Sequence, residues 1–230
     1  MPDPILVVCG LNREADIARG PGIVAVAGGG HRMTLERRLE ELASTPFAAV
    51  VSFGLAGALE SSLRPGAVVI PWRVTGGGRS FDTARALVMR WLPAFDTPSG
   101  RPVLARSAPQ LAGVDAPVLT RAEKGALALA SGAGAVDMES HIAAAFAARR
   151  ILPFAVLRAI SDPSDRDLPP LVSRAMRPDG SVDVVGVLGS LLRGPGQIPA
   201  LVSTARDAGT AFRALRRVRG LLGPRLGLHL

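Results

Sequence analysis

The chain of 230 residues has one cysteine, one lysine and no tyrosine, and aromatic residues make up only 4% of it. The single cysteine, Cys9, excludes an internal disulfide bond, and its position in an apolar run indicates a buried strand thiol rather than a nucleophile. Few aromatic residues are available for bases to stack on, which argues against a nucleic-acid partner. No apolar run reaches transmembrane length, and Asp3 and Pro4 interrupt the start, so neither a membrane span nor a signal peptide is expected.

Groups of metal ligands are also missing from the sequence. The three histidines, His31, His141 and His229, lack the spacing of a zinc site. We therefore expect no metal and no cofactor. The unpaired cysteine fits a reducing compartment, so a cytoplasmic location is expected.

Arginine, in contrast, is frequent, and the formal net charge is +8. Part of this excess lies in a C-terminal stretch that contains Arg206, Arg213, Arg216, Arg217, Arg219 and Arg225. In the same stretch Phe212, Leu215, Val218 and Leu222 share one helical stripe. Such a basic amphipathic helix either makes peripheral contact with the inner face of a membrane or packs on the domain or an oligomer interface. The sequence leaves both interpretations open.

Strand-like and helix-like segments alternate along the first two thirds of the chain. We expect strands at 4–9, 22–27, 48–53, 67–71, 103–106, 116–119 and 154–160, and helices at 12–18, 33–42, 82–91, 121–130 and 139–149. Asn12 is expected to cap the first helix, and Thr120 with Glu123 has the spacing of a capping box. This pattern predicts a single-domain, three-layer α/β fold with a central mixed, mostly parallel sheet flanked by helices.

The pattern changes after Asp165, where Pro163, Pro169, Pro170 and Pro178 interrupt the chain. We expect residues 1–170 to form the domain that carries the site. Residues 171–230 are expected to form a C-terminal helical extension, with helices at 182–192 and 198–219.

Two acidic motifs stand at the ends of apolar, strand-like runs. One is Val136-Asp137-Met138-Glu139, and the other is Arg158-Ala159-Ile160-Ser161-Asp162. In an open α/β sheet ligands bind at the carboxyl ends of the strands, so Glu139 and Asp162 are expected to face one pocket. One carboxylate that binds sugar hydroxyls and another that protonates a leaving group are the requirements for cleaving an N-glycosidic bond.

These motifs resemble those of the nucleoside phosphorylase and nucleosidase superfamily. Two further matches are Ser52 to Ala58, followed by Leu63 to Val69, and Gly10 to Glu14 after the first strand. The matches follow the family order over roughly residues 4–165. The resemblance implies a phosphorylase-like fold, a purine nucleoside substrate, phosphate or water as nucleophile, and a homo-oligomer. Within the family, the hopanoid-associated phosphorylases are similar, which implies an adenosylated hopanoid as the substrate.

The resemblance also implies roles for single residues. Asp162 corresponds to the general acid that serves purine N7, with Ser161 as a hydrogen-bond partner. Glu139 corresponds to the glutamate that binds the ribose hydroxyls, and Met138 to the apolar residue against the sugar. The alternative for Asp162 is a helix N-cap.

Other candidates lie near the N-terminus. Glu14 corresponds to the acid that orients the attacking water, and Arg13 is adjacent to the position that binds phosphate in phosphorylases; a surface ion pair is the alternative for both. Backbone amides of Gly28, Gly29 and Gly30 are candidates for binding phosphate, water or ribose, with a flexible turn as the alternative. Gly54, Ala56 and Gly57 match the turn at which the backbone approaches the substrate.

Two departures from the family pattern bear on the reaction. Ser52 and Leu55 replace the arginine and serine of the usual phosphate site, which favours water as the nucleophile. No aromatic residue lies between Phe95 and Phe146 to stack on the base. A non-catalytic nucleotide- or lipid-binding module is the rival interpretation, and a basic nucleic-acid-binding protein is the third.

Overall fold

The computed structural model describes residues 2–95, 105–106, 110–169 and 198–228. The strands of the described part form one mixed sheet in the order β6-β5-β8-β9-β3-β10-β4-β7, with β1 beside β3 and β2 outside β1. Their bounds are β1 (Ile5–Cys9), β2 (Ile23–Ala27), β3 (Ala49–Ala58), β4 (Val68–Val69), β5 (Arg73–Gly76), β6 (Arg79–Asp82), β7 (Ala105–Arg106), β8 (Gln110–Gly113), β9 (Ala135–Asp137) and β10 (Phe154–Asp162).

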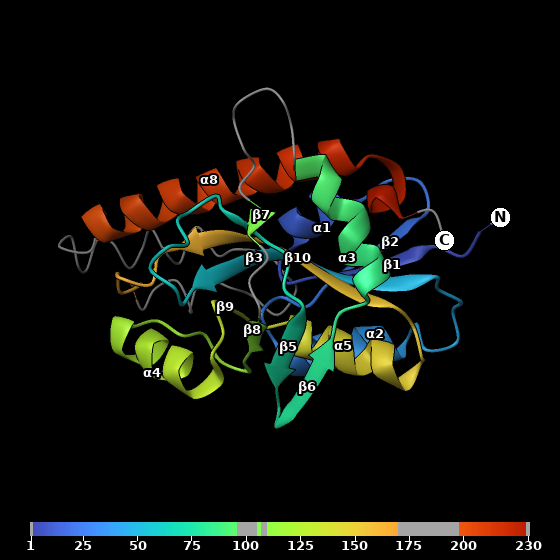
Figure 1. Ribbon diagram of the computed structural model, residues 1–230, viewed down its shortest axis with the longest axis horizontal. Coiled ribbons are helices and arrows are strands. Elements are labelled where there is room, and N and C mark those ends of the chain that lie inside the picture. Colours follow the sequence, from blue (N-terminus) through green and yellow to red (C-terminus); the bar gives the residue numbers. More distant parts are fainter. Residues whose placement is uncertain (1, 96–104, 107–109, 170–197, 229–230) are drawn as a thin grey trace.

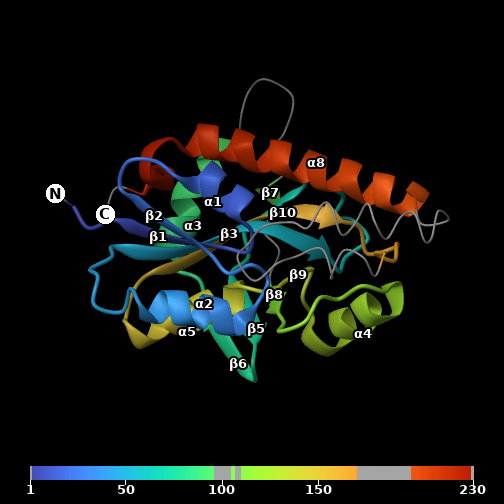
Figure 2. The same cartoon turned by 180° about the vertical axis from the view of Figure 1, so that it is seen from behind.

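Helices cover both faces of this sheet, which makes the three layers visible in Figure 1. Alternate side chains of the buried strands point to opposite faces, so that Val7 and Val51 join one core and Leu6 and Val50 join the other. The first core includes α1 (Asn12–Ala18), α3 (Arg85–Trp91) and α8 (Ile198–Leu222), and the second includes α2 (Arg32–Glu40) and α5 (Ser140–Arg149). The view from behind in Figure 2 shows α2 and α5 together on that second face. The three-layer α/β prediction is confirmed.

Strand β3 is shared by two parts of the sheet. Along one edge it pairs with β10 from Val50 to Gly57. Along the other edge it pairs with β1 only up to Ser52, and with β9 only from Gly57. Beyond the carboxyl end of β1, residues 53–56 of β3 therefore have no strand partner on this edge, although β10 still pairs with the opposite edge. The candidate site lies beside this unpaired edge.

Three local predictions need correction. Residues 116–119 form no strand, because the neighbouring strand is β8 at residues 110–113 and the chain then leaves the sheet. The segment 82–91 is helical only from Arg85, because β5 and β6 form a hairpin across Gly77 and Gly78. Both glycines have positive φ, as a type I′ turn requires. Asn12 is the first residue of α1 rather than its cap, and Leu11 takes the cap position.

The remaining elements are close to their predicted positions. Helix α4 (Arg121–Ser131) begins with the capping box of Thr120 and Glu123. Short 3-10 helices follow α3 at Leu92–Phe95 and α8 at Pro224–Gly227. The expected helix at 182–192 and the boundary at 170/171 lie outside the described residues.

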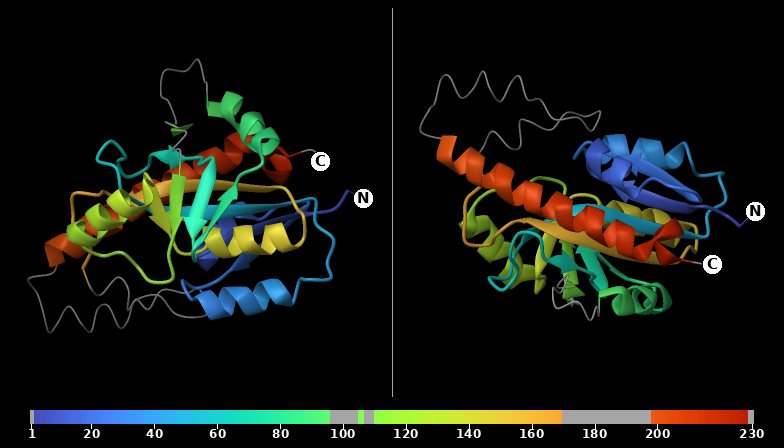
Figure 3. Two further views of the ribbon diagram at one scale, coloured as in Figure 1. Left: turned by 60° about the horizontal axis from the view of Figure 1, so that its bottom comes forward. Right: turned by 90° about the horizontal axis from the view of Figure 1, so that it is seen from above.

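Helix α8 lies along the face of the sheet over most of its length (Figure 3). Its stripe of Phe212, Leu215, Val218 and Leu222 is buried in the same core as β1, which rules out this stripe as a membrane-inserting face. The apolar stripe of α8 thus packs on the sheet, and the arginines at 213, 216 and 217 are exposed. No helix in the described part is long and apolar enough to cross a membrane.

We expect Leu215→Ala to lower the free energy of unfolding by about 2–4 kcal/mol, because it opens a cavity beneath α8 where the side chain is fully buried. Arg216→Ala, one residue away on the exposed side, should change it by about 0.5 kcal/mol or less. Urea unfolding followed by circular dichroism measures both values. Equal effects would contradict the placement of α8 in the core.

Candidate functional site

A cavity of about 380 Å³ lies at the carboxyl ends of β1, β3, β9 and β10. Its volume is in the range of small-ligand sites. Apolar side chains dominate the lining, and four carboxylates add the polar groups. Those carboxylates are Glu14, Asp137, Glu139 and Asp162. Among the described lining residues, none is arginine, lysine or histidine.

Arg158 lies outside the described lining of this cavity and pairs with two of its carboxylates. Its side chain is fully buried on β10, and its Nε lies 2.6 Å from Asp137 Oδ2. Nη2 lies 3.4 Å from Glu139 Oε2 and donates to Ser52 Oγ at 2.6 Å. A buried guanidinium is stable only when paired in this way, so the position of Arg158 fixes the acidic residues around it.

Asp137 has two roles in this arrangement. Besides pairing with Arg158, its Oδ1 accepts a hydrogen bond from the backbone N–H of Ser140 at 3.1 Å. It thereby supports the start of α5. Ser140 Oγ donates to Asp137 Oδ2 and also lies 3.0 Å from Ser52 Oγ.

Glu14 connects the loop after β1 to the uncovered stretch of β3. Its Oε2 accepts from the backbone N–H groups of Gly10 and Leu11, each at 2.8 Å, and its Oε1 accepts from Leu55 N–H at 2.8 Å. The carboxylate therefore replaces a strand as the partner of β3. Burial raises the pKa of Glu14, while Arg158 and these backbone hydrogen bonds oppose the rise.

Glu139 follows β9 and is the N-cap residue of α5. Burial raises its pKa to about 8; Arg158 opposes this rise, and the negative charges of Asp137 and Glu14 add to it. Gly10 is required opposite it, because a Cβ there would lie 2.6 Å from Glu139 Oε1. At neutral pH this carboxyl group can hold a proton, so it can both donate and accept hydrogen bonds.

Asp162 ends β10 and has a different partner. Its Oδ2 accepts a hydrogen bond from Lys124 Nζ of α4 at 2.6 Å, and its Oδ1 accepts one from Ser161 Oγ at 2.8 Å. Gly57 leaves room for this carboxylate, since a Cβ at position 57 would lie 3.0 Å from Asp162 Oδ2. The carboxylate is thus held at both oxygens while it lines the cavity.

The structure brings most of the predicted site residues together. Besides the carboxylates Glu14, Glu139 and Asp162, the cavity lining contains Met138, Ala56, Gly57 and Ser161. Gly54 lies just below, and a Cβ there would lie 2.6 Å from Arg158 Nη1 and 2.7 Å from Glu14 Cδ. Position 54 therefore has no room for a larger residue beside the buried charges.

The other predicted residues lie away from the lining. Gly28 and Gly29 donate their backbone N–H groups to the carbonyls of Cys9 and Gly10, so these two amides already have partners. Gly30 is also outside the lining. Arg13 stacks on Phe212, with its guanidinium carbon 4.0 Å from the ring centre. These contacts argue against a phosphate site built from Arg13 and this loop.

Sequence reasoning missed both buried cations and the contribution of α8. Arg158 and Lys124 were not candidates, because nothing in a single sequence marks a cation as buried. Phe212, Leu201, Thr204, Ala205 and Ala208 of α8 line the cavity at helical spacing, so the apolar stripe of this helix continues from the core over the site. Phe212 is the aromatic residue in the described lining.

Carboxylates at strand ends beside an apolar cavity are typical of an α/β enzyme whose small ligand carries hydroxyl groups and also an apolar ring. A sequence model of the phosphorylase superfamily matches residues 17–175, more than half of the chain. The chain therefore belongs to the phosphorylase superfamily, as the motifs implied, and is an enzyme of the nucleosidase and nucleoside phosphorylase class. No curated protein matches it in sequence.

Solved structures share the fold at low sequence identity. The 5′-methylthioadenosine/S-adenosylhomocysteine nucleosidase of Neisseria meningitidis, in complex with methylthio-immucillin-A, has a TM-score of 0.68 and 16% identity over 96% of this chain and 98% of that one. The corresponding nucleosidase of Colwellia psychrerythraea, in complex with adenine, has a TM-score of 0.62 and 17% identity over 83% and 96%. Futalosine hydrolase of Helicobacter pylori has a TM-score of 0.61 and 15% identity over 70% and 88%.

The raised pKa of Glu139 predicts a pH dependence of stability. The ordinary pKa of a glutamate is 4.5, so between about pH 4.5 and 8 the folded state holds a proton on Glu139 that the unfolded chain releases. The folded state then binds more protons, and its stability falls as the pH rises through this window. We expect Glu139→Gln to show a smaller fall, because glutamine does not ionise. Thermal unfolding at pH 5, 6, 7 and 8 measures this difference, with Glu40→Gln on the exposed side of α2 as control; equal slopes for wild type and Glu139→Gln would contradict it.

Proposed function

We propose that this enzyme cleaves the N-glycosidic bond of an adenosine-type nucleoside and releases adenine. The observation that carries the proposal is the convergence of Glu14, Glu139 and Asp162 from three separate chain segments on one apolar cavity. Cleavage builds positive charge on the sugar and negative charge on the base, so it needs an acid near the base and carboxylates near the sugar. Superfamily membership supports the same reaction class.

In this proposal Asp162 takes up a proton from solvent in the cavity before the reaction and passes it to the departing base, while Ser161 orients the carboxyl group through the 2.8 Å hydrogen bond to Oδ1. Glu139 binds the ribose hydroxyls, and Met138 packs against the sugar. Both positions line the cavity beside β9. Phe212 is the aromatic residue in the described lining, so it can contact the purine ring or the 5′ substituent. The sequence offers no aromatic residue between Phe95 and Phe146 for this contact.

Water is the nucleophile that we propose. The described lining carries four carboxylates and no cationic side chain, and such a surface repels a phosphate dianion. Ser52 is fully buried outside the described cavity lining, where its Oγ accepts hydrogen bonds from Arg158 and Ser140, so it does not face a phosphate in the cavity. Glu14, with its raised pKa, is the base that we assign to the attacking water.

The 5′ substituent that fits this cavity is apolar. Val114, Pro117, Val118, Leu119, Leu168 and Leu201 contribute hydrophobic surface around the carboxylates. Together with the sequence resemblance, this supports adenosylhopane as the substrate, with ribosylhopane and adenine as products. A lipid-borne substrate would bring the enzyme to a membrane surface, and the exposed Arg213, Arg216 and Arg217 of α8 offer an anionic surface a basic face.

We expect Asp162→Asn to lower kcat for adenine release from adenosine by about 10²–10⁴-fold, the usual contribution of a general acid. Chromatography of free adenine measures the rate, and circular dichroism checks that the variant folds. A folded variant with near-normal turnover would remove Asp162 from the reaction. A wild-type protein that binds adenosine without releasing adenine would instead favour the binding-module interpretation.

The choice of nucleophile has its own assay. We expect the wild-type enzyme to release adenine in phosphate-free buffer, with free ribose and no ribose phosphate as the sugar product. Glu14→Gln should lose activity by about 10²-fold or more, because the bound water then has no base. Strict dependence on added phosphate would overturn the hydrolytic assignment.

A further inference from the structure

Lys124, the single lysine of the chain, lies at an unusual position. Helix α4 is exposed along most of its length, and Lys124 is its buried residue, with an exposed fraction of 0%. Taking an ammonium group out of water costs several kcal/mol unless each of its hydrogens has a partner. A helix anchored on the domain normally uses an apolar side chain at such a position. The lysine therefore needs an explanation beyond packing.

The ammonium group has three partners for its three hydrogens. Nζ donates to Asp162 Oδ2 at 2.6 Å, to the carbonyl of Pro163 at 2.7 Å and to the carbonyl of Arg166 at 3.3 Å. Lys124 thus binds both the candidate general acid and the backbone of the segment that follows it. Its fully satisfied hydrogen bonds hold it in one place.

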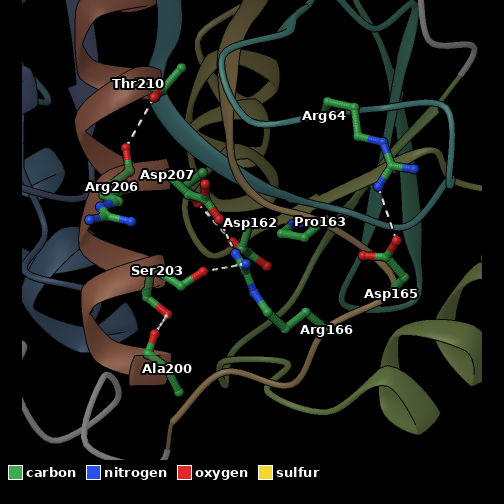
Figure 4. A network of polar contacts seen from close by, with 12 residues as sticks. Arg64, Asp162, Pro163, Asp165, Arg166, Ala200, Ser203, Arg206, Asp207 and Thr210 are labelled. Atoms are coloured by element: carbon green, nitrogen blue, oxygen red, sulfur yellow. Dashed lines mark hydrogen bonds and ion pairs between the residues drawn. The ribbon is translucent and has the colours of Figure 1, made fainter. Parts of the chain in front are cut away.

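The segment bound by Lys124 is also attached to α8. The Arg166 side chain reaches across to α8, where its guanidinium contacts Asp207 and Ser203 (Figure 4). Nearby, Arg64 pairs with Asp165 at 3.0 Å on the exposed side of the same segment. Asp162 is therefore held by α4 through Lys124, and the segment that follows it is attached to α8 through Arg166. Lys124 and the adjacent Ser161 donate directly to its carboxyl oxygens.

We propose that Lys124 is a positioning residue for Asp162, which it holds in the orientation that presents the carboxyl group to the departing base. Lys124 is not among the described residues that line the cavity, so it acts through Asp162 rather than on the substrate. This inference rests on the proposed N-glycosidic cleavage. It adds a residue of α4 to a site that is otherwise built from β1, β3, β9, β10 and α8.

A pair of substrates separates positioning of the acid from general support of the fold. Adenine is a poor leaving group without protonation, whereas p-nitrophenyl β-D-ribofuranoside releases a stable anion and needs no acid. Lys124→Met keeps the aliphatic stem and removes the charge. We expect kcat on adenosine to fall roughly 10- to 100-fold, within the contribution of general acid catalysis, while kcat on the nitrophenyl riboside changes by about threefold or less.

Arg121→Met is the matched control. Arg121 lies one turn earlier on α4, is exposed, and pairs with Asp167 of the same segment at 3.5 Å. It removes a cation from the same helix without touching Asp162, so both substrates should be turned over at nearly wild-type rates. Equal losses on the two substrates in Lys124→Met, or no loss on adenosine, would overturn the positioning role.

A double-mutant cycle covers the case in which Lys124→Met fails to fold because the buried carboxyl group of Asp162 has lost its partner. The double variant Lys124→Met/Asp162→Asn has neither the ammonium nor the carboxyl group, so it does not leave one buried without the other. If Lys124 acts only through Asp162, the double variant should be no slower on adenosine than Asp162→Asn alone. A further loss of about tenfold would show an independent role and overturn the proposal.

A wild-type enzyme that releases no base would overturn the proposed function and this role together, whereas an active wild type with additive losses overturns this role alone.

Discussion

The ion pairing of Arg158 is the constraint on which the rest of the site depends. A guanidinium that is fully buried on a central strand cannot remain unpaired, and it finds Asp137 at 2.6 Å and Glu139 at 3.4 Å. Those two residues flank the end of β9, so the pair fixes where β9 ends and where α5 begins. The close approach of Arg158 to Gly54 explains why β3 has no side chain at that point.

The same region shows how an incomplete sheet produces a site. Between Ser52 and Gly57 one edge of β3 has neither β1 nor β9 as partner. An unpaired backbone N–H in a buried position is costly, and Glu14 supplies the missing acceptor to Leu55. A carboxylate that completes a sheet in this way is held rigidly, and here it also lines the cavity. Glu14 therefore satisfies the backbone of β3 and is at the same time the candidate catalytic base.

The sequence supported a correct prediction of the fold because apolar strands and helices alternate in it. It also placed Glu139 and Asp162 at one cavity, but the geometric reason differs from the expected one. Strand β9 runs antiparallel to β3 and β10 runs parallel to it, so the two strand ends meet on either side of Gly57 rather than at one edge of a parallel sheet. The β5–β6 hairpin was missed although Gly76-Gly77-Gly78 marked it, because the following residues also fit a helix. Burial of a cation depends on contacts between residues far apart in the chain, so Lys124 and Arg158 gave no local signal. The buried face of α8 likewise depends on the sheet beneath it, which the amphipathic pattern alone does not specify.

The carboxylates of the site differ in their hydrogen-bond and ion-pair partners, and each set of partners suits a different chemical role. Glu14 is held by three backbone amides and has a raised pKa, which suits a group that receives a proton from water. Glu139 has a weaker contact with Arg158, and burial raises its pKa to about 8, which suits a group that both donates to and accepts from sugar hydroxyls. Asp162 accepts a hydrogen bond from Lys124 Nζ at 2.6 Å, so its position is fixed by a neighbouring helix rather than by the substrate. In the proposed reaction the ribose lies between Glu139 and Glu14 and the base lies toward Asp162, so these partners together would orient the nucleoside before any bond breaks.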